Sequence, residues 1–133
     1  MSEAIRAYRI SLWLFHAGLI MIGLYFGRIV INGGSPVTPE LYGPAVYSIP
    51  ALVWAAGQVG AHGLVILGLA VWGRLGRAMV LIGAIIGGIF HSFLAYFGAL
   101  ASQGTLVHAA SMFVTVPACV LTIAFVRWSS RYG

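Results

Sequence analysis

The chain has 133 residues, of which 61% are hydrophobic and 7% charged, and its formal charge is +5. Soluble domains carry roughly a quarter charged residues, so this composition excludes a soluble globular enzyme. It indicates a protein embedded in the lipid bilayer. One transmembrane span takes about 20 mostly apolar residues, which leaves room for about four spans and no second domain. We therefore expect residues 1–133 to form a single transmembrane domain.

The apolar runs predict four helices in chain order. The first covers about residues 10–31 and is followed by a long loop, 32–48, which is rich in glycine and proline. The second covers about 50–73 and begins at Pro50, a favourable residue in the first turn of a helix. Residues 74–77 are expected to turn the chain into a third helix at 78–101, and a fourth follows at 105–128. The predicted fold is all-α, an integral membrane four-helix bundle.

The arginines predict the orientation of this bundle. Only Arg28 falls near the side that carries the long loop, and the other six lie on the opposite side: Arg6, Arg9, Arg74, Arg77, Arg127 and Arg131. Because basic residues mark the cytoplasmic side, we expect both termini in the cytoplasm, the loop outside, and a bacterial inner membrane as the location. The arginines form no basic stripe with interleaved aromatics, so no nucleic-acid partner is expected.

Helices in lipid associate mainly through close packing of small residues. Rows of small residues spaced four apart occur in three of the predicted helices: Gly23 and Gly27; Ala56, Gly57, Gly60 and Ala61; Gly83, Ala84, Gly87 and Gly88. These rows predict helix contacts, and a sharper interpretation is that the glycines clear space for a flat cofactor. The fourth helix carries a polar stripe instead, which is expected to face the bundle interior or another subunit: His108, Ser111, Thr115 and Thr122, with Cys119 beside them.

Each predicted helix contains one histidine: His16, His62, His91 and His108. Ionisable residues within a span are functional candidates by default. At about 1.5 Å per residue, His62 and His91 lie roughly 18 Å and 15 Å below the outer ends of their helices. Two histidines at matching depth on antiparallel helices are candidate axial ligands of haem b, with Gly87 and Gly88 providing clearance. The alternatives are hydrogen bonds between helices and a proton relay or ion path.

Catalytic residues are scarce in this sequence. None of the predicted spans contains an aspartate or glutamate, and the motifs of metalloproteases, serine hydrolases and P-loop proteins are missing. We therefore expect a non-catalytic structural or anchor subunit of a larger membrane assembly, with haem b or a quinone near His62 and His91 as candidate ligand. Its expected partners are the lipid bilayer and other membrane subunits or further copies of itself. Two alternatives stay open: a holin-like pore former of phage type, and a small channel or transporter lined by the polar stripe.

Overall fold

The computed structural model describes residues 3–31, 51–100 and 109–132. It consists of four helical rods, each long and apolar enough to cross a membrane. The first rod is α1 (Glu3–Ile31), and the second joins α3 (Ala51–Trp54), the π-helix η1 (Ala55–Gly60) and α4 (Ala61–Val71). The third is α5 (Arg74–Leu100), and the fourth contains the π-helix η2 (Ser111–Thr115) and α7 (Val116–Tyr132). The predicted all-α four-helix bundle is confirmed. The predicted loop 32–48 and His108 lie outside the described residues. Gly27 and Arg28 belong to α1, but their surroundings are outside the described part of the structure.

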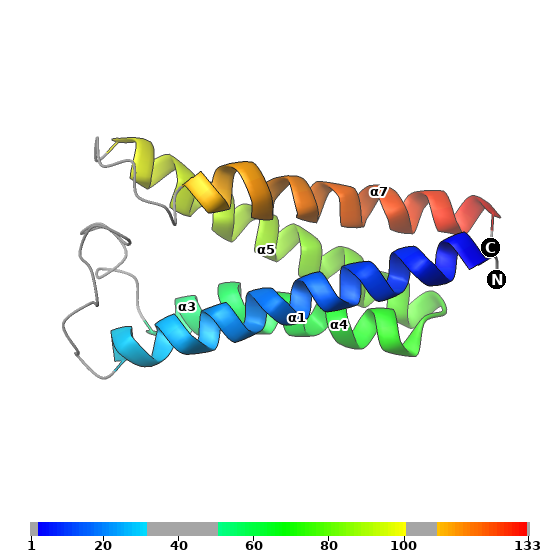
Figure 1. The fold of residues 1–133 in the computed structure, drawn as a ribbon, viewed down its shortest axis with the longest axis horizontal. Coiled ribbons are helices and arrows are strands. Elements are labelled where there is room, and N and C mark those ends of the chain that lie inside the picture. Colours follow the sequence, from blue (N-terminus) through cyan, green and yellow to red (C-terminus); the bar gives the residue numbers. More distant parts are fainter. Residues whose placement is uncertain (1–2, 32–50, 101–108, 133) are drawn as a thin grey trace.

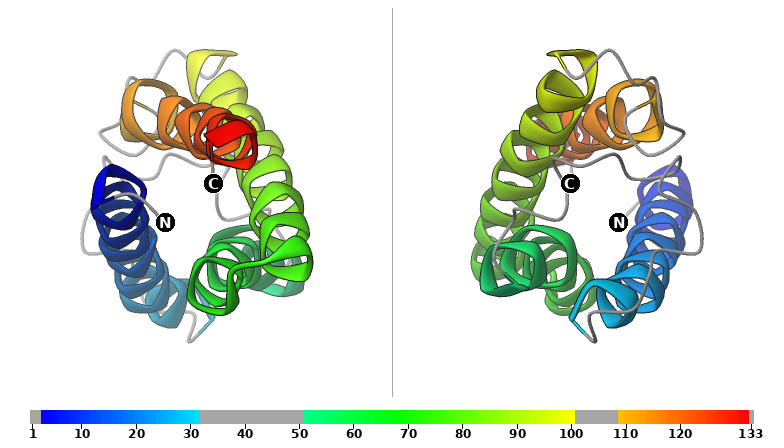
Figure 2. Two further views of the ribbon diagram at one scale, coloured as in Figure 1. Left: turned by 90° about the vertical axis from the view of Figure 1, so that its right-hand side faces the viewer. Right: turned by 90° about the vertical axis from the view of Figure 1, so that its left-hand side faces the viewer.

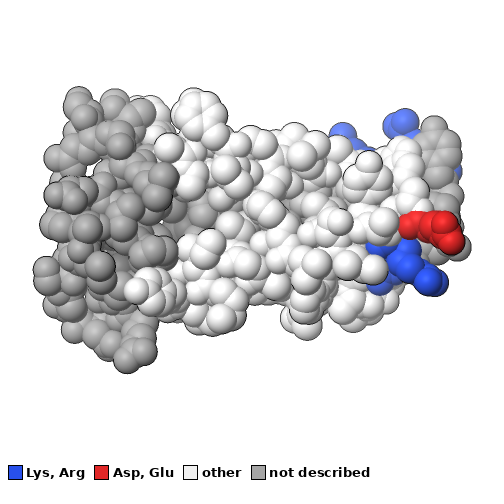
Figure 3. Space-filling model, in the orientation of Figure 1, with Lys and Arg blue, Asp and Glu red and all other residues white. Residues whose placement is uncertain are grey.

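The rods lie side by side and alternate in direction (Figure 1). Seen end-on, the second rod lies between α1 and α5, and α5 lies between it and α7 (Figure 2). The start of α1, the end of α7 and the turn between α4 and α5 share one end of the bundle (Figure 1). The charged side chains that the structure describes gather at that end (Figure 3), which we call the arginine end. The opposite end is called the loop end.

The turn between the second and third rods lies earlier than the sequence predicts. Residues 74–77 do not form it, because α5 already begins at Arg74. The chain reverses at Trp72 and Gly73, which have φ angles of 44° and 110°. Glycine adopts the second value without steric cost. Gly76 serves close packing instead, since a Cβ there would lie 2.5 Å from the carbonyl oxygen of Gly68.

Small residues bring α4 and α5 into backbone contact. A Cβ on Gly68 would lie 2.8 Å from the backbone nitrogen of Val80. Further along the same interface, a Cβ on Gly83 would lie 2.5 Å from the carbonyl oxygen of Ala61 and 3.0 Å from the backbone nitrogen of Val65. Such approaches replace side-chain bulk with contact between helix backbones, which is the main source of helix association in lipid.

A proline accounts for the π-helix in the fourth rod. Pro117 has no N–H to donate to the carbonyl of Phe113, and its ring would crowd that carbonyl in a regular α-helix. Over Ser111–Thr115 the chain widens to a π-helix, and the N–H of Val116 donates to the carbonyl of Ser111. Irregular turns of this kind relieve the strain that a proline imposes on a helix.

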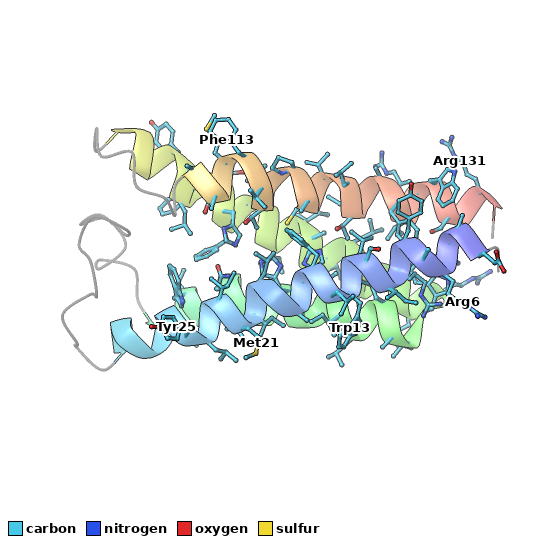
Figure 4. All side chains as sticks on the ribbon, in the orientation of Figure 1. Arg6, Trp13, Met21, Tyr25, Phe113 and Arg131 are labelled. Atoms are coloured by element: carbon cyan, nitrogen blue, oxygen red, sulfur yellow. The ribbon has the colours of Figure 1, made fainter. Side chains whose placement is uncertain are left out.

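The arginine end of the bundle has an apolar core. This core contains the following buried side chains: Ile5, Val65, Leu69, Val80, Ala84, Phe125 and Val126. Here α1 and α7 meet through aromatic rings, with the ring of Tyr8 centred 6.1 Å from those of Phe125 and Trp128. Other apolar side chains, such as the labelled Met21 and Phe113, point outward from the bundle (Figure 4).

Arg9 fastens α1 to the end of α4. Its Nη2 and Nε donate to the carbonyl oxygen of Leu69 at 2.6 and 3.2 Å. Its guanidinium also lies 4.9 Å from the centre of the Trp72 ring. Carbonyls in the last turn of a helix lack intrahelical partners and carry the negative end of the helix dipole. Arg9 therefore caps a neighbouring helix.

Candidate functional site: a histidine chain beside a lateral pocket

Three buried histidines from three rods are joined in one chain of hydrogen bonds. His16 and His62 are 0% exposed and His91 is 4% exposed. The Nδ1 atoms of His16 and His62 lie 2.9 Å apart, and the Nε2 atoms of His62 and His91 lie 3.4 Å apart. The fourth rod closes both ends, because His91 Nδ1 lies 3.1 Å from Ser111 Oγ and His16 Nε2 lies 3.1 Å from Thr122 Oγ1. The chain therefore links all four rods.

The direction of this chain follows from the Thr122 hydroxyl. Thr122 Oγ1 donates its single hydrogen to the carbonyl oxygen of Ala118 at 2.7 Å, so it must accept from His16 Nε2. A neutral imidazole has one donor and one acceptor nitrogen, which makes His16 Nδ1 the acceptor from His62 Nδ1. By the same rule His91 Nε2 donates to His62 Nε2, and the hydroxyl of Ser111 donates to His91 Nδ1. All ring nitrogens are satisfied without any buried charge.

The pair predicted as haem ligands is brought together in a way that does not fit a haem. His62 and His91 touch directly, with ring centres 5.5 Å apart, whereas axial ligation requires the macrocycle to lie between them. The space beside Gly87 is also filled, since a Cβ there would lie 3.2 Å from His62 Cε1 and 3.6 Å from Cys119 Sγ. A Cβ on Gly88 would lie in van der Waals contact with Cys119, at 3.5 Å from the Cβ of Cys119. The matching depth of His62 and His91 places their rings within hydrogen-bonding distance of each other.

The remaining candidates divide between the interior and the outside. The stripe residues Ser111, Thr115, Cys119 and Thr122 are all buried. Gly57 packs under the ring of Phe90 and Gly23 under the side chain of Gln58. Ala61 is buried as well, whereas Ala56 and Gly60 face outward. Among the residues that the structure describes, no cluster of three or more histidine, cysteine or acidic side chains is arranged to hold a metal ion.

A pocket of about 390 Å³ lies next to the chain of hydrogen-bonded histidines, toward the loop end of the bundle. Its lining comes from all four rods: Leu14, Phe15, Gly18, Leu19, Ile22, Gly23, Trp54, Gln58, His91, Leu94, Ala110, Ser111, Val114 and Thr115. This size is within the range of sites for small molecules, about 300–1,000 Å³. Mostly apolar walls with a few convergent polar groups are also typical of such sites. The pocket therefore combines an apolar slot with the end of the histidine chain.

Two polar side chains near the pocket come from the second rod. Gln58 Nε2 donates to the carbonyl oxygen of Leu19 at 3.0 Å, which ties η1 to α1. The indole Nε1 of Trp54 is buried and has no hydrogen-bond partner in the described part of the chain. The Trp54 ring meets Phe90 edge-on, with ring centres 5.7 Å apart. An aromatic wall thus borders the pocket on this side.

Sequence reasoning overlooked the central contact of the site, between His16 and His62. Counting residues along the helices matched only His62 with His91, because that count assumes straight helices with the same tilt. The π-helix η1, which begins just before Gln58, was not expected either. Comparisons with protein-family models, with curated proteins and with solved structures found no match to this chain.

Proposed function

We propose that the chain is an integral membrane protein that serves as a non-catalytic anchor subunit of a larger membrane assembly. The observation that carries this proposal is the closed hydrogen-bond chain. Every ring nitrogen of His16, His62 and His91 is bonded within the protein. These histidines therefore hold helices together, which leaves no imidazole nitrogen in the described bundle free to act on a substrate.

Two surface features support contacts with other membrane helices. First, α1 buries only 11% of its most apolar window, against 44%, 39% and 33% in the other rods. Second, the second rod has small residues on its outside: Ala56 and Gly60 are exposed, and a Cβ on Gly63 would meet open space. Small residues on a lipid-facing surface allow a further helix to approach closely.

A channel is less well supported by the packing. Toward the arginine end, the described interior is filled by the apolar core around Val65, Val80 and Phe125. The histidine chain ends at the carbonyl oxygen of Ala118, on the loop-end side of that core. An ion or proton path needs polar groups or water through the whole thickness of the membrane. The holin-like alternative requires the protein to associate with copies of itself. The composition of the complex therefore distinguishes it from the anchor role.

The assembly is tested by solubilising membranes of the producing organism in a mild detergent. A tagged chain of 14.1 kDa should migrate in a complex with other integral membrane subunits. Gly60→Leu, which adds bulk on the exposed small face, should release these subunits. Leu121→Ala, on an equally lipid-facing position of α7, serves as the matched control. A chain that forms only homo-oligomers and depolarises cells when overproduced would establish the pore-forming alternative instead.

The orientation is tested by cysteine accessibility in a Cys119→Ser background. Both termini are expected in the cytoplasm, because the described arginines lie at the end of the bundle where α1 begins and α7 ends (Figures 1 and 3). A Ser130→Cys variant should react with a membrane-impermeant thiol reagent only after cells are opened. A Ser35→Cys variant should react in intact cells. The reverse pattern contradicts the proposed topology, and absence of the protein from the membrane fraction contradicts the proposed insertion.

A further inference from the structure

The lateral pocket beside the histidine chain has no use in the anchoring role. Its rim includes Leu14 and Ile22 on α1, which are 60% and 53% exposed, and Val114 on the fourth rod, which is 48% exposed. The pocket therefore opens sideways, between α1 and η2. In a bilayer this opening faces the hydrocarbon region, so an occupant must itself be soluble in lipid.

The direction of the histidine chain decides what the inner wall of the pocket offers to a ligand. The Ser111 hydroxyl gives its only hydrogen to His91 Nδ1, so Ser111 Oγ has a lone pair but no hydrogen left. His91 Nδ1 is occupied by the same bond. Gln58 uses Nε2 toward Leu19, which leaves its oxygen as the acceptor end of the amide. Ser111 Oγ and the Gln58 oxygen therefore present acceptors, whereas the Thr115 hydroxyl and the second amide hydrogen of Gln58 can donate. Such a wall suits a ligand hydroxyl, which can donate to Ser111 Oγ and accept from a neighbouring donor.

The aromatic lining narrows the class of ligand. Phe15 from α1 and Trp54 from the second rod both line the pocket. Aromatic walls favour an aromatic ring as occupant. The indole N–H of Trp54 is a donor that a carbonyl ligand would seek, but this atom is buried away from the pocket surface.

We propose that the pocket binds a lipid-soluble phenol or hydroquinone, whose ring hydroxyl donates to Ser111 Oγ. The ligand then extends the chain that passes through His91, His62 and His16 to Thr122. Each added bond in such a chain strengthens its neighbours, because aligned hydrogen bonds polarise one another. The inference rests on the proposed insertion in a bilayer, and it is independent of any partner protein.

The test measures binding to the purified full chain in lipid nanodiscs. The probes are a brominated long-chain 4-alkylphenol, its methyl ether and the matching alkyl aryl ketone, each detected by quenching of tryptophan fluorescence. The phenol should bind about fivefold more tightly than the ether, as one net hydrogen bond gives. Ser111→Ala should abolish that preference and leave the affinity for the ether unchanged.

Two glycine variants keep the test valid if Ser111→Ala disturbs the fold. A Cβ on Gly18 would meet nothing within 4 Å, and Gly18 lines the pocket. Gly18→Leu should therefore fill the slot and lose binding of both the phenol and the ether. Gly63 is equally open but lies outside the pocket, so Gly63→Leu should bind both like the unchanged protein.

Several results would overturn the inference. They are equal affinity for phenol and ether, tighter binding of the ketone, absence of binding to the unchanged protein, and unchanged binding to Gly18→Leu. If the chain fractionates as an integral membrane protein and one of these results is obtained, the inference fails and the anchoring role stands. If the chain is not integral to the membrane, both proposals fail together.

Discussion

Replacing His62 with leucine tests the histidine chain most directly, because His62 is its middle link. His62→Leu removes the 2.9 Å bond to His16 and the 3.4 Å bond to His91, and it leaves two buried ring nitrogens without partners. Side-chain hydrogen bonds in membranes contribute about 0.6 kcal/mol each on average, which gives a lower bound of about 1.2 kcal/mol. A stranded buried polar group costs about 1–3 kcal/mol, and the longer bond contributes less because it exceeds the usual range. We expect a loss of about 2 kcal/mol.

The assay is the free energy of unfolding in detergent micelles, with Leu67→Ala as control. Leu67 lies on the same rod and is 56% exposed, so its truncation should change the free energy little. The double variant His62→Leu/Thr122→Val adds a second measurement. These residues do not touch, and independent sites are additive within about 0.5 kcal/mol. A larger interaction energy indicates that the chain acts as a unit, whereas a loss below about 0.5 kcal/mol for His62→Leu would refute the reasoning.

The direction of the chain has its own signature in nitrogen NMR. We expect the hydrogen on Nε2 in His16 and His91 and on Nδ1 in His62, which the ¹⁵N shifts of imidazole distinguish. The opposite tautomer in His16 would reverse the chain. The hydroxyl hydrogen of Ser111 would then be free, and the inference that Ser111 Oγ acts only as an acceptor toward the pocket would fail.

The other predictions concern contacts between the rods. Gly83→Ala should lower the free energy of unfolding by about 1–3 kcal/mol, because the new methyl group meets the backbone of α4. Gly63→Ala, where a Cβ meets open space, should be close to neutral. Equal effects of the two substitutions would contradict the close contact at Gly83. Arg9→Gln should lower stability by about 1 kcal/mol, since the cap on Leu69 is lost. Arg9→Lys should restore only part of it, because a lysine cannot bond through two nitrogens in a fixed fork; full restoration would show that charge alone matters.

The residue pattern was sufficient to predict the class of fold and the approximate bounds of most helices. Apolar runs of span length separated by glycine and proline are sufficient for four helices, because hydrocarbon requires every backbone polar group to be paired within its own helix. The row from Gly83 to Gly87 predicted a close helix face for a different reason, because small residues let helices in lipid approach closely. The distribution of arginines indicated which end of the bundle is charged, as Figure 3 shows for the described residues.

The pairing of the polar residues depends on how the rods pack against one another. The sequence placed His62 and His91 at one depth, but only the packing of α1 against the second rod brings His16 to His62. A histidine has the same residue type whether it binds iron or another imidazole, so pairing depends on distances between rods that sequence spacing does not contain. The same holds for Gly76, which looked like a turn residue and is a contact residue. Tilt, π-turns and backbone approach are properties of the assembled bundle, and they determine which polar groups meet.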